Sequence, residues 1–222
     1  MAREALFRLP NDTQRAAVIG RTGSGKTLAA LWHLSKRNFD SYPWLILDYK
    51  TDESINSIER AEHIGLEEEP KRPGIYIVHP LPGEEAETEK LLWTVWRRGS
   101  TGIYADEAYM IGDNQAFEAC LTQGRSKHIP MIILTQRPAW LSRFVFSEAD
   151  FFQLFHLNDK RDRKTVEAFM PSNTGEVAPN YHSLWYDVGK NRLTHFLPVP
   201  PADRTLDVIN NKLKNMRRNR PI

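Results

Sequence analysis

Gly20-Arg21-Thr22-Gly23-Ser24-Gly25-Lys26-Thr27 is the stretch that decides the fold of this chain. It fits the pattern G-x-x-x-x-G-K-[ST] without a mismatch, and this pattern is typical of a loop that wraps around nucleotide phosphates. Glycines let backbone N–H groups turn toward an anion, Lys26 can reach the β- and γ-phosphates, and the Thr27 hydroxyl can bind Mg²⁺. All eight residues are therefore candidate nucleotide-binding residues.

The segments on either side of this loop support that prediction. Ala16–Ile19 is short and apolar, as expected of a buried strand, and Leu28–Leu34 has the composition of a helix. A helix that follows the loop directs the positive end of its dipole at bound phosphates. The alternative, a chance glycine-rich turn, does not account for a strand before the loop and a helix after it.

Short apolar segments recur along the chain and alternate with helical segments, which predicts an α/β fold with a mainly parallel sheet. Their continuous apolar character indicates strands buried on both faces. The expected strands are Ala16–Ile19, Trp44–Leu47, Ile75–Val78, Gly102–Ala105, Met131–Leu134 and Phe151–Leu157. The expected helices are Thr27–Lys36, Glu84–Arg97, Ala116–Ser126, Lys160–Phe169 and Leu206–Met216.

Gly102–Ala108 is the second informative segment, because its apolar strand ends in Asp106 and Glu107. This is the Walker B pattern that accompanies a phosphate loop. Asp106 is expected to hold Mg²⁺, directly or through water, and Glu107 to orient and polarise the attacking water. An isolated Asp-Glu pair at a strand end is usually a solvated turn, and the phosphate loop upstream makes this pair informative.

Ile132–Pro138 is another buried strand that ends in polar residues. Ligands bind at the carboxyl ends of parallel strands. Gln136 is therefore a candidate γ-phosphate sensor, since its amide can donate to phosphate and accept from water. An ordinary amide that caps the end of the strand is the alternative.

An arginine at a subunit edge can stabilise the transition state at a neighbour's nucleotide. Arg125, in Gln123–Ser126 near the end of a predicted helix, is the candidate for this arginine finger. Arg137 and Arg143 compete with it. From residue chemistry alone, Arg125 is hardly distinguished from any surface arginine.

The composition excludes several classes of protein. The chain has 222 residues, with 30 Lys and Arg against 28 Asp and Glu, so its net charge of +2 does not by itself indicate nucleic-acid binding. Cys120 is the single cysteine, which excludes an intramolecular disulfide. No signal peptide and no apolar run long enough to cross a bilayer are recognised. We expect a soluble protein that reaches a membrane only through a partner.

The C-terminal part has a different character. Tyr181–Val188 and Arg192–Leu197 flank Gly189-Lys190-Asn191 and predict a β-hairpin, whereas Met170–Asn180 reads as a loop. Residues 203–222 carry six basic and two acidic side chains, and a helix is expected there. We therefore divide the chain into an ATPase domain, residues 1–202, and a basic helical tail, residues 203–222. The tail can contact phosphates or an acidic partner, or can be a solvated helix end.

Taken in order, these motifs resemble those of the FtsK–HerA superfamily of DNA-pumping ATPases, over roughly residues 16–140. Two further elements carry the resemblance, Leu47-Asp48-Tyr49-Lys50 and Thr135-Gln136-Arg137-Pro138. The second residue of Asp48-Tyr49-Lys50 is Tyr where many relatives have Pro. Because the chain is small, it is most similar within the superfamily to genome-packaging ATPases of tailless icosahedral viruses with an internal membrane, the tectivirus type.

The resemblance implies a RecA-like (ASCE) P-loop fold that uses ATP and Mg²⁺. It also implies a ring, hexameric in this interpretation, with double-stranded DNA in its channel and with capsid or packaging-vertex proteins as partners. The protein would then act in the host cytoplasm and at the packaging vertex of the virion. The implied catalytic and metal-binding residues are Lys26, Thr27, Asp106, Glu107, Gln136 and, acting on the neighbouring subunit, Arg125.

Two other functions remain open from the sequence. A nucleoside or small-molecule kinase also uses a phosphate loop, and Arg161, Arg163 and Lys164 could form its lid. The Thr-Gln-Arg-Pro element has no role in that scheme. A non-motor phage assembly ATPase is the other alternative, but such proteins normally include a membrane-spanning segment.

In the packaging interpretation, Arg161, Arg163 and Lys164 and the basic tail are candidates for DNA contact. The histidines show no metal-ligand spacing, so we expect no metal besides Mg²⁺.

Overall fold

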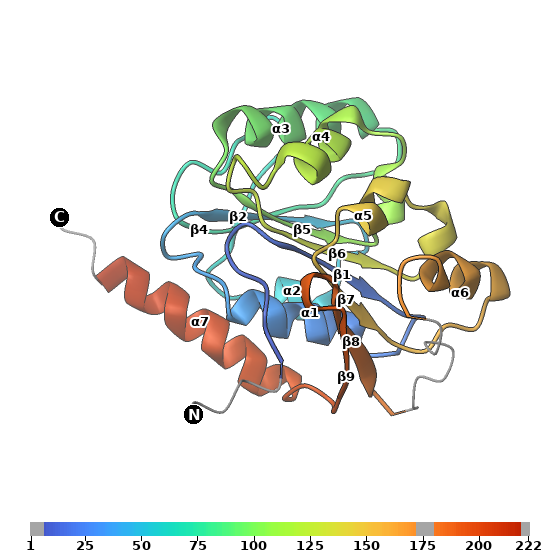
Figure 1. The fold of residues 1–222 in the computed structure, drawn as a ribbon. Coiled ribbons are helices and arrows are strands. Elements are labelled where there is room, and N and C mark those ends of the chain that lie inside the picture. Colours follow the sequence, from blue (N-terminus) through green and yellow to red (C-terminus); the bar gives the residue numbers. More distant parts are fainter. Residues whose placement is uncertain (1–6, 172–179, 219–222) are drawn as a thin grey trace.

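The computed structural model describes residues 7–171 and 180–218, and of the last two residues it describes the backbone only. Within these ranges, nine strands form one sheet with helices on both faces (Figure 1). The strands are β1 (Arg15–Ile19), β2 (Pro43–Asp48), β3 (Glu62–His63), β4 (Gly74–Val78), β5 (Gly102–Asp106), β6 (Met131–Thr135), β7 (Phe151–Leu154), β8 (Ser183–Asp187) and β9 (Arg192–Phe196). The helices are α1 (Lys26–Ser35), α2 (Glu53–Asn56), α3 (Glu85–Arg98), α4 (Gln115–Gln123), α5 (Arg143–Ser147), α6 (Lys160–Glu167) and α7 (Ala202–Arg218), with 3₁₀ turns η1 (Ala108–Ile111), η2 (Pro138–Trp140) and η3 (Val188–Lys190).

The strand order in the sheet is β3-β4-β2-β5-β6-β1-β7-β8-β9. The strands from β3 to β7 pair in parallel, and β8 and β9 extend the sheet as an antiparallel hairpin. Every residue of β1, β2, β5 and β6 is buried, as expected of central parallel strands with both faces covered. The predicted α/β fold with a mainly parallel sheet is therefore confirmed.

The helices form a layer on each face of the sheet. In the view of Figure 1, α3 and α4 lie above it and α1, α2 and α7 lie below it. Each layer has its own apolar core, and the lower one includes Ile209 and Leu213 of α7. The ammonium group of Lys212 also donates to the backbone carbonyl of Ser35 over 2.8 Å. The described part of α7 is thus packed against α1.

The register of the central strands aligns their carboxyl ends. Ile19 is opposite Thr135, and Asp48 is opposite Asp106. The segments that follow β1, β2, β5 and β6 therefore leave the sheet at one edge. β1 lies between β6 and β7, so the loop after it emerges beside the ends of both neighbours. This edge is where ligands bind in open α/β sheets.

Most predicted elements are present, with bounds shifted by a few residues. The prediction for β7 is too long, since the strand ends at Leu154 rather than Leu157. Beyond it, the N–H of Phe155 donates to the carbonyl of Ile19, and the N–H of Arg21 donates to that of His156. The residues after β7 therefore stay beside β1 and the phosphate loop, although the regular strand has ended.

The C-terminal hairpin is confirmed as β8 and β9, joined through η3. The last helix begins at Ala202, four residues before the predicted start. Residues 172–179 of the predicted loop and 219–222 of the predicted tail lie outside the described residues. The division into domain and tail stays a prediction. The short elements β3, α2 and α5 were not expected, because two to five residues carry no usable periodicity.

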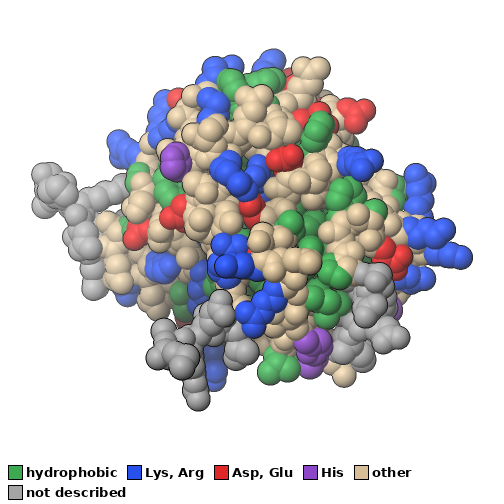
Figure 2. All heavy atoms as spheres, viewed as in Figure 1, with side chains coloured by type: hydrophobic (Ala, Val, Ile, Leu, Met, Phe, Trp, Pro, Cys, Tyr) green, Lys and Arg blue, Asp and Glu red, His purple; other side chains and the backbone are tan. Residues whose placement is uncertain are grey.

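One group of basic side chains lies at the end of the molecule formed by α6. Figure 2 shows Lys and Arg side chains at its right-hand end, over α6. The sequence of this helix, KRDRKTVE, contains four of them. Lys160, Arg161 and Lys164 are exposed, and we refer to these three as the α6 cations.

Candidate functional site

The predicted phosphate loop joins the end of β1 to the start of α1. Gly20 lies so close to Phe155 that a β-carbon on it would stand 2.6 Å from the β-carbon of Phe155. Gly25 has φ +92°, a left-handed conformation that favours glycine, and it caps the helix that begins at Lys26. The loop therefore turns tightly and leads directly into the N-terminus of α1, as an anion-binding loop requires.

Three charged side chains meet at this edge and are almost completely buried: Lys26 is 6% exposed, Asp106 2% and Glu107 0%. The Lys26 ammonium lies 2.9 Å from Glu107 Oε1. Burial, and then the charge of Glu107, raises the pKa of Asp106 to about 7, while Lys26 opposes this shift. Buried charges of this kind are costly unless they are paired, so their convergence indicates a functional site.

Asp106 fits the predicted Mg²⁺ ligand. Its Oδ1 atom is buried without a hydrogen-bond partner among the described residues, and a carboxylate oxygen is the ligand that Mg²⁺ prefers. Thr27 and Asp106 line one cleft, which is described below. Within residues 7–171 and 180–218, no group of three or more His, Cys, Asp or Glu side chains could hold a metal. Few protein ligands suit Mg²⁺, which usually completes its shell with water and substrate phosphates.

Glu107 is held by more groups than the sequence indicated. The Lys50 ammonium lies 2.5 Å from Glu107 Oε1, and the backbone N–H of Gln136 donates to Oε2 over 3.2 Å. Glu107 has φ +47°, which is uncommon for a residue with a side chain. Such backbone strain persists only where surrounding contacts impose it, and it is frequent in active sites.

Gln136 connects the phosphate loop to Glu107. The Thr22 hydroxyl donates to Gln136 Oε1, while the backbone of Gln136 contacts Glu107. The predicted sensor residue thus lies between the loop and the predicted base. Its role as a sensor stays a prediction.

A cleft of about 650 Å³ lies over these groups, within the size range of small-molecule sites. Its lining includes the charged and polar side chains of Lys26, Thr27, Lys50, Asp106 and Glu107. It also includes apolar side chains, those of Leu28, Phe155, Tyr181, Pro198, Val199 and Pro201. This combination suits a nucleotide, whose phosphates are charged and whose base is flat and largely apolar at its faces.

Sequence reasoning missed the apolar lining of the cleft. Tyr181 and the segment from Pro198 to Pro201 follow the phosphate loop by more than 150 positions. No motif marks them, and only the fold places the C-terminal hairpin beside the loop. Lys50 carried a signal, because it belongs to the Asp48-Tyr49-Lys50 element, but the sequence did not give it a role.

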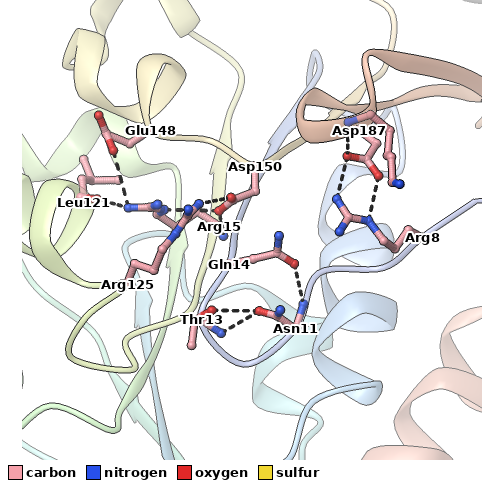
Figure 3. Close-up of polar contacts among 11 residues, drawn as sticks. Arg8, Asn11, Thr13, Gln14, Arg15, Leu121, Arg125, Glu148, Asp150 and Asp187 are labelled. Carbon is pink, nitrogen blue, oxygen red and sulfur yellow. Dashed lines mark hydrogen bonds and ion pairs between the residues drawn. The ribbon is translucent and has the colours of Figure 1, made fainter.

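Arg125 is not near this cleft in its own chain. Its guanidinium pairs with Asp150, which also contacts Arg15, the first residue of β1 (Figure 3). The phosphate loop follows the opposite end of that strand. The side chain of Arg125 is 60% exposed.

The competing arginines lie elsewhere. Arg137 follows Gln136 directly and lies 3.8 Å from Asp162 of α6. It also lines a second cleft of about 500 Å³ that contains Arg21, Thr22 and Gln136. The Arg143 guanidinium lies over the ring of Phe169, 5.5 Å from its centre. Of the three arginines, Arg137 is the one next to a predicted site residue.

Known proteins resemble this chain in sequence and in fold. No protein-family model matches the chain. The DNA packaging ATPase P9 of Enterobacteria phage PRD1 is 51% identical over 212 residues, which cover 90% of this chain and 93% of that protein.

Solved structures show the same fold. The genome packaging NTPase B204 of Sulfolobus turreted icosahedral virus 2, in complex with AMPPCP, matches with a TM-score of 0.67 at 18% identity, covering 86% of this chain and 100% of that one. The pCW3 conjugation coupling protein TcpA matches with a TM-score of 0.62 at 14% identity, covering 92% of this chain and 65% of that one. These likenesses confirm a RecA-like P-loop ATPase fold.

Proposed function

This chain belongs to the tectivirus-type genome-packaging ATPases of the FtsK–HerA superfamily, and on that basis we propose that it hydrolyses ATP to move double-stranded viral DNA into a preformed capsid. The observation that carries the proposal is the arrangement beside the loop that follows β1, where Lys26, Asp106 and Glu107 line one cleft and the backbone N–H of Gln136 contacts Glu107. A kinase would not require the contact between Gln136 and Glu107.

The buried charges indicate how the site would work. Lys26 would bind the β- and γ-phosphates, and Gln136 would contact the γ-phosphate. Glu107 would orient the attacking water and accept its proton. Thr27 and Asp106 would hold Mg²⁺, which neutralises phosphate charge when it is bound. Because Lys26 pairs with Glu107 in this structure, phosphates must compete with Glu107 for the ammonium group of Lys26.

We further propose that the site is completed by a neighbouring subunit in a ring. Arg125 lies at the far end of β1 from its own phosphate loop, and its exposed guanidinium can face another chain. A head-to-tail arrangement would bring the Arg125 of one subunit to the cleft of the next. A ring of six subunits is the expected form.

The proposed DNA contact is α6. The α6 cations are exposed, while Arg163 donates to the backbone carbonyls of Leu157 and Asn158. The buried carboxylate of Asp162 accepts from the N–H of Ala139, 3.0 Å away and three residues after Gln136. The helix is thus fixed to the segment that follows the predicted sensor. Such a contact would bind DNA phosphates without reading sequence.

One cation of the basic tail is occupied within its own chain, whereas Arg204 and Lys214 are exposed. Lys212 donates to backbone carbonyls of Ser35 and Arg37. No helix in the described ranges is long and apolar enough to span a bilayer. Attachment to capsid or packaging-vertex proteins, and through them to a membrane, stays part of the proposal.

ATPase activity with and without double-stranded DNA, measured on size-fractionated protein, tests this function. We expect turnover that DNA stimulates and that appears in the oligomeric fraction. Activity confined to the monomer and indifferent to DNA would contradict it. Transfer of phosphate to a nucleoside would favour a kinase instead.

A further inference from the structure

The Asp48-Tyr49-Lys50 element begins at the last residue of β2 and leads into a tight turn. Asp48 is 0% exposed. Its carboxylate accepts from the backbone N–H of Lys50 over 3.2 Å and of Asp52 over 3.0 Å. Thr51 within the turn has φ +54°. A short polar side chain that binds the backbone two residues on is the usual way to fix such a turn. The turn therefore fixes the backbone of Lys50, from which its side chain extends.

This turn places Lys50 beside the predicted base. β2 and β5 are paired so that Asp48 lies opposite Asp106, which brings Lys50 close to Glu107. The Lys50 and Lys26 ammonium groups both contact the same oxygen, Glu107 Oε1, over 2.5 and 2.9 Å. Glu107 thus has two cations for a single carboxylate. Lys26 is buried, whereas the side chain of Lys50 is 40% exposed.

A nucleotide would disturb this arrangement. Its phosphates carry several negative charges and attract Lys26 away from Glu107. The carboxylate of Glu107 is fully buried, so the loss of its counter-ion would leave an uncompensated buried charge. Removal of one member of a buried ion pair is strongly unfavourable for this reason. Nucleotide binding would be opposed by the same free energy unless a second cation remained.

We propose that Lys50 remains the counter-ion of Glu107 when nucleotide binding moves Lys26 onto the phosphates. This inference rests on the proposed function, because it takes Lys26 as the phosphate ligand. Lys50 is then a positioning residue that acts through Glu107. Together with the N–H of Gln136 on Oε2, it keeps the carboxylate paired and in place.

The inference makes a specific prediction for nucleotide affinity. In Lys50→Met, departure of Lys26 leaves Glu107 unpaired, so both MgADP and MgAMPPCP should bind roughly tenfold more weakly or worse. Lys50→Arg keeps the charge and should stay within about threefold of the wild type. In a Glu107→Gln background no carboxylate is left unpaired. There, Lys50→Met should change affinity by less than about threefold.

Calorimetric titration of the full chain with MgADP and with MgAMPPCP measures these affinities. Lys90→Met, on the exposed face of α3, is the matched control for loss of a lysine. Nearly full binding in Lys50→Met/Glu107→Gln would also show that loss of Lys50 does not unfold the site. A merely structural role for Lys50 would not be relieved by Glu107→Gln.

Three outcomes would overturn the inference. Unchanged affinity in Lys50→Met would show that Glu107 needs no second cation. Weaker binding of MgAMPPCP alone, not relieved by Glu107→Gln, would show that Lys50 binds the γ-phosphate directly. Failure of the wild-type protein to bind either nucleotide would overturn the proposed function, and this inference with it.

Discussion

Asp106→Asn should stabilise the nucleotide-free protein at alkaline pH. Burial and the charge of Glu107 raise the pKa of Asp106 from 3.8 to about 7. Between these two values the folded protein keeps a proton on Asp106 that the unfolded chain has released. The free energy of unfolding therefore falls as the pH rises through this window. Asparagine has nearly the same shape and cannot ionise, so it removes this pH dependence.

The size of the effect follows from the shift. Each pKa unit corresponds to about 1.4 kcal/mol, so the full shift amounts to about 4 kcal/mol at pH 8, where both states are ionised. At pH 5 the unfolded chain has released its proton but the folded protein has not. The difference there is only about 1.5–2 kcal/mol. The advantage of Asp106→Asn should thus grow by about 2–3 kcal/mol from pH 5 to pH 8.

Urea denaturation of wild type and Asp106→Asn at pH 5, 6, 7 and 8, without nucleotide or Mg²⁺, measures this difference. Asp113→Asn, at an exposed aspartate, is the control for loss of a carboxylate and should follow the wild type at every pH. Asp106→Asn should also lose Mg²⁺-dependent hydrolysis, because stability and cation binding compete at position 106. Parallel pH profiles for wild type and Asp106→Asn would refute the reasoning.

Three further predictions concern turnover. Glu107→Gln should lower kcat by about 10²–10⁴-fold in a steady-state ATPase assay, with nucleotide binding retained; an unchanged kcat would exclude Glu107 as the base. Mixtures of Lys26→Ala and Arg125→Ala subunits, each inactive alone, should regain activity, since some interfaces then combine an intact Lys26 with an intact Arg125; a mixture that stays inactive would exclude Arg125 as the finger. Replacement of the three α6 cations by Gln should abolish DNA stimulation while basal turnover persists, and the salt dependence of DNA binding should become shallower. Replacement of the exposed cations Lys71, Lys90 and Arg97 is its control.

The fold was predictable where the chain is buried on both faces. β1, β5 and β6 each contain a short, continuously apolar segment, and each strand is fully buried. The predicted end of β7 was wrong, because the apolar residues that follow this strand have another environment. Phe155 is buried like the residues of β7, but it packs against the phosphate loop rather than extending the sheet. Hydrophobicity alone does not distinguish these two environments.

The candidate site was predictable to the extent that its chemistry is local in sequence. The phosphate loop and the Asp106–Glu107 pair each lie within a few consecutive residues of one strand end. Lys50 is different, because it contacts a residue 57 positions away. Its proximity to Glu107 follows from the pairing of β2 with β5, which the sequence does not specify. Tyr181 lies even further along the chain and reaches the cleft only through the C-terminal hairpin.

Arg125 and Lys26 share an arrangement that bears on how a ring could work. Each pairs with a buried or half-buried carboxylate that also holds a second cation: Asp150 holds Arg15, as Glu107 holds Lys50. If Arg125 turns toward a neighbour's nucleotide, Asp150 keeps the backbone N–H of Arg15 at 2.9 Å and its guanidinium at 3.5 Å. Neither carboxylate would then be left without a partner. Exchange of the functional cation between a resting partner and a phosphate would therefore require little free energy, as a site that binds and releases nucleotide in every cycle needs.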